Sequence, residues 1–139
     1  MSIKSVAHVC IKTTELEKTG RFYCEALGMK KQFNFTKNGR VTGFYLKASG
    51  NTFVEVFEVP DPQASNTNGC LSHFCLETDS IEKLRQKLID AGYEPRPISL
   101  GCDQSYQCWI KDPNGIDMEF HQYTAESSQA TGKDVEINW

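Results

Sequence analysis

The pattern of apolar and polar positions occurs twice along the chain. Residues 8–18, HVCIKTTELEK, align with residues 73–83, HFCLETDSIEK, at a constant offset of 65. At that offset the histidine, cysteine, glutamate and lysine positions coincide, and apolar positions meet apolar positions. Each segment alternates as a strand does and then changes to a helical period. We therefore interpret the chain as a duplication.

Each copy of the repeat predicts a helix with a defined start and stop, followed by strands. Thr14 and Asp79 each precede a glutamate by three residues, which is typical of a capped helix start. Gly28 and Gly92 are expected at the helix ends, so each helix spans roughly 13 residues. We expect strands over 29–36, 40–48, 52–59, 93–98, 106–111 and 116–123, with turns at Asn38-Gly39, Ser49–Asn51 and Asp112–Gly115.

These elements predict an α+β fold made of two βαβββ modules. The modules cover about 3–59 and 70–123, and we interpret 1–139 as a single domain because neither module alone has a full core. The segment 60–69 is rich in proline and asparagine and is expected to connect the modules. The tail, 124–139, is polar and shows no periodicity before Val135.

Composition narrows the classes of function. The 139 residues are 39% hydrophobic with a net charge of −3, so no basic field exists for nucleic acid. No apolar run is long enough to span a bilayer, and the N-terminus lacks the features of a secretory signal. We therefore expect a cytoplasmic protein without nucleic-acid or membrane partners, in which the six cysteines are free thiols.

Candidate chemistry lies at equivalent positions of the two modules. His8 and His73 stand on the first strands, and Glu55 and Glu119 stand on the last strands among apolar neighbours. A buried, unpaired carboxylate is costly, so two such glutamates with two equivalent histidines indicate a shared divalent cation. This mixed set of nitrogen and oxygen donors suits Ni²⁺, Co²⁺, Mn²⁺ or Zn²⁺.

Such a site has a direct chemical use. Four protein ligands leave about two positions open on an octahedral ion, which two vicinal oxygens of a substrate can fill. The ion then stabilises a developing enediolate as a Lewis acid. A glutamate beside it is placed to act as general base on the adjacent C–H.

Strand alternation extends the site to neighbouring side chains. Cys10 and Cys75 share the faces of the two histidines, where we expect small packing residues in preference to ligands. His121 shares the face of Glu119 and is a candidate second acid or base, or a hydrogen-bond partner of the substrate. An apolar part of the pocket is assigned to Phe44, Phe53, Phe57, Tyr106 and Trp109.

The chain resembles the vicinal oxygen chelate superfamily, which includes glyoxalase I, bleomycin-resistance proteins, methylmalonyl-CoA epimerase and extradiol dioxygenases. The resemblance spans about residues 3–123 and is marked by RFYCEALGM at 21–29 and DPNGIDME at 112–119. It implies a cupped mixed sheet that encloses one metal ion. It also implies a homodimer, which exposed sheet edges favour as well.

Within that family, the two histidines and two glutamates are most similar to bacterial-type glyoxalase I. That lyase isomerises a glutathione hemithioacetal to a thioester through an enediolate. By this analogy Glu119 is the favoured catalytic base and Glu55 its counterpart. Lys12 and Val59-Pro60 stand where the family places an arginine and an asparagine for glutathione. The resemblance therefore implies a small hemithioacetal or α-hydroxycarbonyl substrate and leaves glutathione use open.

Other functions fit the same residues. An epimerase, a thiol transferase or a dioxygenase would use the same metal site. A non-enzymatic protein that binds and sequesters a small molecule, as in antibiotic resistance, would not need the metal. Metal content therefore separates the enzyme hypotheses from sequestration.

Overall fold

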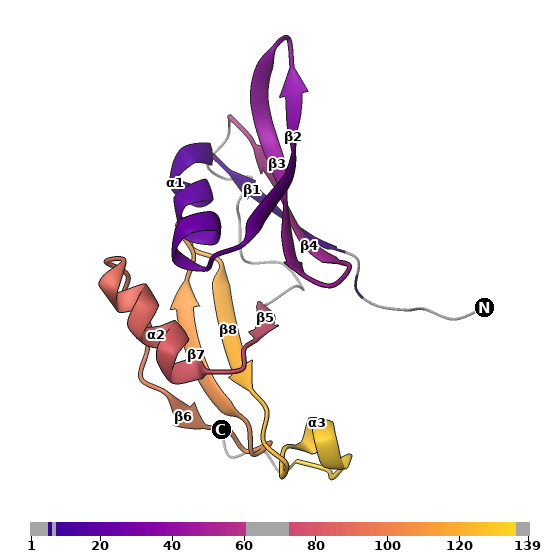
Figure 1. Ribbon diagram of the computed structural model, residues 1–139, viewed down its shortest axis with the longest axis vertical. Coiled ribbons are helices and arrows are strands. Elements are labelled where there is room, and N and C mark those ends of the chain that lie inside the picture. Colours follow the sequence, from indigo (N-terminus) through magenta and orange to yellow (C-terminus); the bar gives the residue numbers. More distant parts are fainter. Residues whose placement is uncertain (1–5, 7, 61–72, 136–139) are drawn as a thin grey trace, which may run out of the picture. The chain divides into compact units, whose positions relative to one another are not determined.

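The computed structural model describes residues 6, 8–60 and 73–135 of the chain. Its elements fall into two compact units, each with its own four-stranded sheet (Figure 1). Unit 1 comprises the residues up to Gly69 together with the turn Asp112–Gly115, and unit 2 comprises Cys70–Lys111 with Ile116–Trp139. This architecture confirms the predicted α+β fold of two repeated modules. Most of the predicted connector lies outside the described residues.

Unit 1 has the strand order β1-β4-β3-β2. Strand β1 pairs with β4 in parallel, and the other pairs are antiparallel. The helical segment after β1 provides the long connection that a parallel arrangement requires. The elements are β1 (His8–Thr13), α1 (Leu16–Gly20), η1 (Arg21–Ala26), β2 (Lys30–Lys37), β3 (Arg40–Ser49) and β4 (Thr52–Glu58).

Unit 2 repeats this arrangement with the strand order β5-β8-β7-β6. Strand β5 is parallel to β8, and the remaining pairs are antiparallel. The elements are β5 (Phe74–Glu77), α2 (Ile81–Asp90), β6 (Ser99–Leu100), β7 (Tyr106–Lys111), β8 (Asp117–Gln122) and α3 (Ser128–Thr131).

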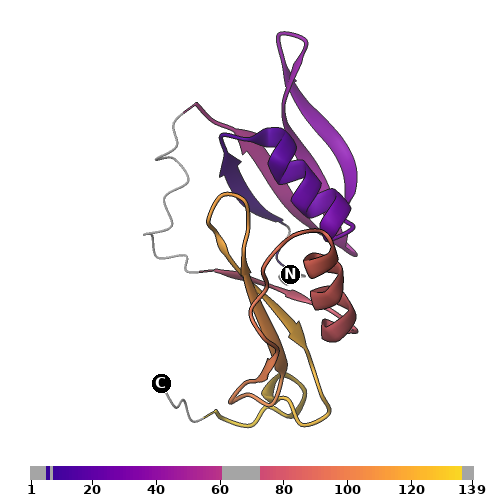
Figure 2. The same ribbon diagram turned by 90° about the vertical axis from the view of Figure 1, so that its left-hand side faces the viewer.

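One face of each sheet packs against the helix of its own unit (Figure 2). Alternation along the strands directs the apolar residues of the core to this covered face and leaves the next residues on the opposite, helix-free face. In unit 1 the covered face carries Ile11, Phe44, Leu46, Val54 and Val56; in unit 2 it carries Cys108, Ile110, Met118 and Phe120. The helix-free faces therefore carry the candidate ligands.

The first helix differs from its prediction. It consists of five α-helical residues followed by the six-residue π-helical segment η1, in which the amide of Leu27 donates to the carbonyl of Phe22. The wider turn accompanies full burial of two consecutive aromatic residues, Phe22 and Tyr23. The longest helix described, α2, has ten residues. No helix in the described ranges is long and apolar enough to cross a membrane.

The predicted caps are wrong, whereas the predicted stops and turns are confirmed. The N-cap residues of α1 and α2 are Glu15 and Ser80, one position after Thr14 and Asp79, and neither makes a side-chain capping hydrogen bond, so Thr14 and Asp79 do not have the expected role. At the start of α2 a side chain from a distant strand caps the helix instead, because Gln122 Oε1 accepts a hydrogen bond from the amide of Ile81 at 2.8 Å. The stops and turns have the expected left-handed conformation at Gly28, Asn38, Gly39, Gly92 and Gly115.

The strand predicted over 93–98 is also wrong. Only Ser99–Leu100 forms a strand there, and it pairs with the start of β7. Pro95 and Pro97 have no amide hydrogen to donate to a ladder. The segment still follows β7, because the amide of Arg96 donates to the carbonyl of Trp109 at 2.8 Å.

The tail of the chain contains a helical turn that its polar sequence did not indicate. Helix α3 is tied to the loop before β7, since the amide of Ser128 donates to the carbonyl of Asp103 at 2.8 Å. A buried hydrogen bond of 3.1 Å also links Ser105 Oγ to Ser127 Oγ. The tail therefore holds the loop that carries Asp103. Residues 136–139 lie outside the described ranges.

Candidate functional site

Unit 1 brings together the first predicted pair of ligands. His8 on β1 and Glu55 on β4 share the helix-free face, with Nε2 of the imidazole 3.8 Å from a carboxylate oxygen. Tyr45 lies directly across from Glu55 on β3, and its Oη is 3.2 Å from Nδ1 of His8. A partner on Nδ1 fixes the orientation of the ring, so that Nε2 is presented to Glu55.

Unit 2 builds the second pair on the same plan. His73 Nε2 lies 3.4 Å from Glu119 Oε2. Trp109 lies directly across from Glu119 on β7, and its ring meets the His73 ring edge-on at 4.7 Å. Each unit therefore contains one imidazole–carboxylate pair beside an aromatic residue of the third strand of its module. The four-residue ligand set that combines the two pairs remains a prediction.

The two glutamates differ in burial. The side chain of Glu119 is 9% exposed and that of Glu55 is 19% exposed, with no lysine or arginine paired to either among the described residues. A carboxylate held out of water requires positive charge or hydrogen-bond donors. Imidazole nitrogens and carboxylate oxygens are ligands of first-row divalent ions, so the donor chemistry of both pairs fits the predicted cation.

His121 lies against Glu119, as its place on β8 predicts. Its Nε2 is 2.8 Å from Glu119 Oε1, while His73 approaches the other oxygen. Nε2 is buried and makes no geometrically sound hydrogen bond within the described part of the chain. On the other side of the ring, Nδ1 lies 3.9 Å from Asp103 Oδ2. Glu119 is thus flanked by an imidazole on each oxygen.

Asp103 is a site residue that the sequence did not reveal. Burial alone would raise the pKa of its carboxyl, but hydrogen bonds from Gln129 and Ser105 lower that pKa below its ordinary value. Gln129 Nε2 donates at 2.7 Å and Ser105 Oγ at 2.8 Å, both to Oδ2. Asp103 stands in a loop without periodicity, and its partners come from the tail, so no local signal identified it.

Two cysteines lie directly beside the glutamates. Cys75 pairs with Glu119 across β5 and β8, and Cys10 pairs with Glu55 across β1 and β4. Burial, with the nearby carboxylates, raises the pKa of Cys75 to about 12 and that of Cys10 to about 11. The cysteines in the described ranges are free thiols, as predicted, and Cys70 lies outside those ranges.

Five aromatic side chains form a continuous set of ring contacts on the helix-free face of unit 1. The rings of Phe33 and Tyr45 stack at 4.8 Å, as do those of Tyr45 and Phe53, and Phe35 meets Phe57 at 4.5 Å. Phe53 and Phe57 were predicted to line the pocket, whereas the other three were not. We call this group the aromatic platform: Phe33, Phe35, Tyr45, Phe53 and Phe57.

Two residues predicted to line the pocket lie elsewhere. Phe44 pairs with Val56 and is 3% exposed, so it belongs to the covered face under α1. The next residue, Tyr45, is the one that shares the face of Glu55. Tyr106 lies two and four residues before the buried Cys108 and Ile110 of β7, so it shares their covered face and lies on the opposite face from Trp109. Of the predicted aromatic residues, the structure brings Phe53 and Phe57 to the face of Glu55, and Trp109 to that of Glu119.

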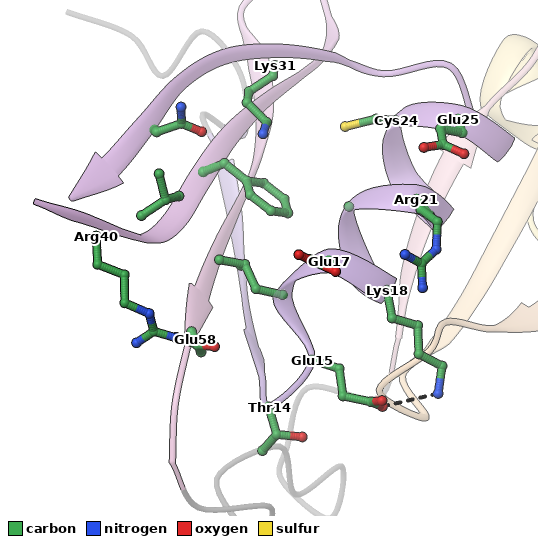
Figure 3. Close-up of a pocket in the computed structure, with 15 residues that line it drawn as sticks. Thr14, Glu15, Glu17, Lys18, Arg21, Cys24, Glu25, Lys31, Arg40 and Glu58 are labelled. Carbon is green, nitrogen blue, oxygen red and sulfur yellow. Dashed lines mark hydrogen bonds and ion pairs between the residues drawn. The ribbon is translucent and has the colours of Figure 1, made fainter. Parts of the chain in front are cut away.

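A pocket of about 990 Å³ lies on the covered side of unit 1, between α1–η1 and the edge of the sheet (Figure 3). Phe44 lines it, but none of the predicted ligands does. It is lined by equal numbers of acidic and basic residues, so its charge selects neither anions nor cations. The charged lining residues are Glu15, Glu17, Lys18, Arg21, Glu25, Lys31, Arg40 and Glu58.

Comparison with known proteins agrees with this architecture. The model of the Glyoxalase/Bleomycin resistance protein/Dioxygenase superfamily matches residues 5–120. The "Uncharacterized protein YwkD" of Bacillus subtilis (strain 168) is 29% identical over 102 residues, covering 70% of this chain and 80% of YwkD. A "Probable lactoylglutathione lyase" of Synechocystis sp. is 25% identical over 127 residues, covering 86% of this chain and 95% of that protein.

A solved structure shows the same fold at lower identity. TnmS3, described as an antibiotic binding protein from Streptomyces sp. CB03234, superposes with a TM-score of 0.70 at 18% identity. The match covers 89% of this chain and 99% of TnmS3. The proteins that this chain resembles therefore include one described as an antibiotic binding protein and one described as a probable lactoylglutathione lyase.

Proposed function

The chain belongs to the Glyoxalase/Bleomycin resistance protein/Dioxygenase superfamily, and from this premise we propose that it is a metal-dependent lyase or isomerase of the glyoxalase I type. Its substrate is a small hemithioacetal or α-hydroxycarbonyl compound, and the reaction passes through an enediolate. The observation that carries the proposal is the imidazole–carboxylate pair that recurs in both units, His8 with Glu55 and His73 with Glu119.

The residues present suit the metal that proteins of this superfamily typically bind. His8, Glu55, His73 and Glu119 would hold it through two nitrogens and two carboxylates. When bound, the ion would supply Lewis-acid stabilisation of negative charge on two neighbouring substrate oxygens.

Glu119 is the better placed of the two glutamates for proton transfer. Its carboxylate is largely removed from water, and contacts with His73 and His121 hold both of its oxygens. As general base it takes the proton from the carbon that bears the substrate hydroxyl, and it returns that proton to the neighbouring carbon. Glu55, which is more exposed, is the counterpart that completes the set.

The aromatic platform supports a specific second candidate, a small-molecule binding protein. Stacked aromatic side chains on a helix-free face bind flat apolar groups without any chemistry. The structural likeness to TnmS3 shows only the fold and does not support this alternative by itself. The support comes from the stacked rings of the platform. In the enzyme, the same platform would bind the apolar part of the substrate beside Glu55.

A metal-reconstitution experiment separates the candidates. The protein is stripped with a chelator, reloaded with Ni²⁺, Co²⁺, Mn²⁺ or Zn²⁺, and assayed with hemithioacetals of methylglyoxal and with hydroxyketones. We expect turnover that depends on one ion per site and is lost in His8→Ala. Glu58→Gln is the matched control, since it alters a half-buried carboxylate of β4, which pairs with Arg40 and touches neither imidazole–carboxylate pair.

The outcomes are distinguishable. Turnover that survives metal removal would contradict the proposal. Binding of aromatic ligands with unchanged affinity in the presence or absence of metal, and without turnover, would favour sequestration.

A further inference from the structure

Unit 2 contains a second set of metal-ligating groups around Glu119. Cys75, Glu119 and His121 each offer one donor atom, and these atoms all lie within 4.8 Å of one another. The set does not use His73, and it combines a thiol with an imidazole and a carboxylate. All three residues come from the neighbouring strands β5 and β8, in which Cys75 pairs directly with Glu119.

The geometry of His121 points to a shared cation. Its buried Nε2 approaches Glu119 Oε1 to 2.8 Å, yet it makes no hydrogen bond of acceptable geometry within the described residues. A buried polar nitrogen without a hydrogen bond is costly. Two ligand atoms that lie close together without a hydrogen bond between them can both be satisfied by one cation.

The environment of His121 is that of a supported metal ligand. Histidines that bind metal through one nitrogen commonly direct the other toward a carboxylate. Here Nδ1 faces Asp103 at 3.9 Å, and Asp103 is itself held by Ser105 and Gln129. This support comes from the loop before β7 and from α3, so the tail of the chain contributes to the orientation of His121.

We propose that unit 2 binds a divalent cation of the zinc or cobalt class through Cys75 Sγ, Glu119 and His121 Nε2. Three protein ligands with one open position are typical of reactive zinc sites, and a thiolate shifts preference toward such borderline-soft ions. Binding replaces the S–H bond of Cys75 with an S–metal bond and releases the proton to solvent. Side chains whose donor atoms all lie within 4.8 Å of one another can turn to meet one ion at ligand distances of about 2.0–2.3 Å.

This inference goes beyond the proposed function. Glu119 belongs to both sets, so an ion held by Cys75 and His121 competes with the arrangement that His73 and unit 1 complete. The described part of unit 1 offers no equivalent set, because Phe57 stands two residues after Glu55 where unit 2 has His121 after Glu119. Cys10 therefore provides a matched control within the same chain.

Cobalt titration of the full-length protein tests the site. A cobalt–thiolate bond gives a charge-transfer absorption in the near ultraviolet, so the spectrum reports ligation by cysteine directly. We expect this absorption in the wild type, with one proton released from the thiol per ion bound. We expect it to be lost in Cys75→Ser and kept in Cys10→Ser. His121→Ala should weaken cobalt binding at least tenfold, whereas His73→Ala should leave the thiolate absorption in place.

Each contrary result overturns the site. A wild-type titration without thiolate absorption, or a Cys75→Ser spectrum equal to that of the wild type, would contradict ligation by Cys75. Loss of binding in His73→Ala with none in His121→Ala would assign the ion to the proposed catalytic set alone. Circular dichroism of each variant establishes that it is folded, and Cys75→Ala provides a second cysteine variant if the serine protein is not.

A double variant in unit 1 tests the proposed enzymatic function separately from the cation site of unit 2. The double variant His8→Ala/Glu55→Ala should lose turnover and keep the cobalt–thiolate absorption, because both residues belong to unit 1. Absorption that disappears in this double variant would contradict a site contained in unit 2, whether or not the enzyme proposal holds.

Discussion

The two units share their ligand positions and differ in what surrounds them. In each sheet a histidine of the first strand meets a glutamate of the last strand. The neighbours of that glutamate are Phe53 and Phe57 in unit 1, but Asp117 and His121 in unit 2. Two helix-free faces with one plan thus have different chemistry. The first face is richer in aromatic side chains, which fits the proposed binding of the substrate, and the second is richer in polar side chains, which fits the proposed proton transfer.

The same contrast extends to the third strand of each module. Gly43 lies across from Phe57, and the equivalent residue of unit 2, Gln107, lies across from His121. A glycine leaves room for the rings of the aromatic platform, while a glutamine adds a polar side chain. The duplication therefore accounts for the ligand pairs, and the substitutions around them account for the different roles proposed for the two faces.

The largest effect should separate the two glutamates. We expect Glu119→Ala to lower kcat by about 10²–10⁴-fold, the usual contribution of a positioned general base. Glu55→Ala should act mainly through metal occupancy, so that excess metal restores much of its activity. Steady-state kinetics over a range of metal concentrations checks both. Equal losses of kcat in the two variants, with no recovery in excess metal, would contradict the different roles proposed for Glu119 and Glu55.

The next effect concerns the stability of the two sheets. A Cβ at Gly43 would overlap the carbonyl oxygen of Val56 and lie 2.9 Å from the ring of Phe57. We therefore expect Gly43→Ala to lower the free energy of unfolding by about 1–3 kcal/mol. Gln107→Ala is the matched substitution in unit 2 and should cost less than about 1 kcal/mol. Urea unfolding of both variants measures the difference.

Alkaline pH should act on unit 1 through its helix. Burial, with the neighbouring Asp112, raises the pKa of Tyr23 well above its ordinary value of 10, whereas the equivalent residue of α2 is the apolar Leu88. The folded state holds the phenol proton more tightly than the unfolded chain does. The free energy of unfolding should therefore fall above pH 10, by up to about 1.4 kcal/mol per pH unit.

Tyr23→Phe should remove the share of the alkaline loss that begins near pH 10, while the share due to the raised pKa values of Cys75 and Cys10 stays the same in both proteins. The phenol donates to Asp112 Oδ2 at 3.0 Å, so the variant also loses one buried hydrogen bond at neutral pH. Denaturant unfolding between pH 8 and pH 11 provides the test. A variant with the same pH dependence as the wild type would assign the loss to other groups.

The smallest effect should appear in ligand selectivity. Benzohydroxamate and acetohydroxamate offer the same pair of chelating oxygens and differ in one phenyl group. We expect the wild type to prefer benzohydroxamate, and Tyr45→Ala to reduce that preference by about 0.5–1.5 kcal/mol. Tyr106→Ala, on the covered-face side of β7, should leave it unchanged. Calorimetry with both ligands gives the two affinities, and equal selectivity in Tyr45→Ala would exclude the platform.

The repeat made much of the fold predictable. Its two periodicities located the first strands and the helices, and the pairing of His8 with Glu55 follows because β1 and β4 are parallel neighbours. The one-residue error between Phe44 and Tyr45 shows the limit of this approach. Successive residues of a strand face opposite sides, so choosing Phe44 assigned the pocket to the covered face.

Features that depend on distant contacts were not predictable. Gln122 reaches Ile81 from a strand that lies 41 residues further along the chain, so a local capping rule did not find it. Asp103 acquires its role from hydrogen bonds to the tail and from its approach to His121. These interactions exist only once the sheet of unit 2 and α3 have formed.

Solvent exchange at the reacting carbon tests the central claim most directly. The metal-loaded protein is incubated in deuterated water with the hemithioacetal of methylglyoxal or with a hydroxyketone, and proton magnetic resonance follows the C–H next to the carbonyl. The account predicts deuterium at that carbon with wild-type protein, at least a hundredfold less with Glu119→Gln, and wild-type exchange with Glu58→Gln. Wild-type exchange in Glu119→Gln would contradict it.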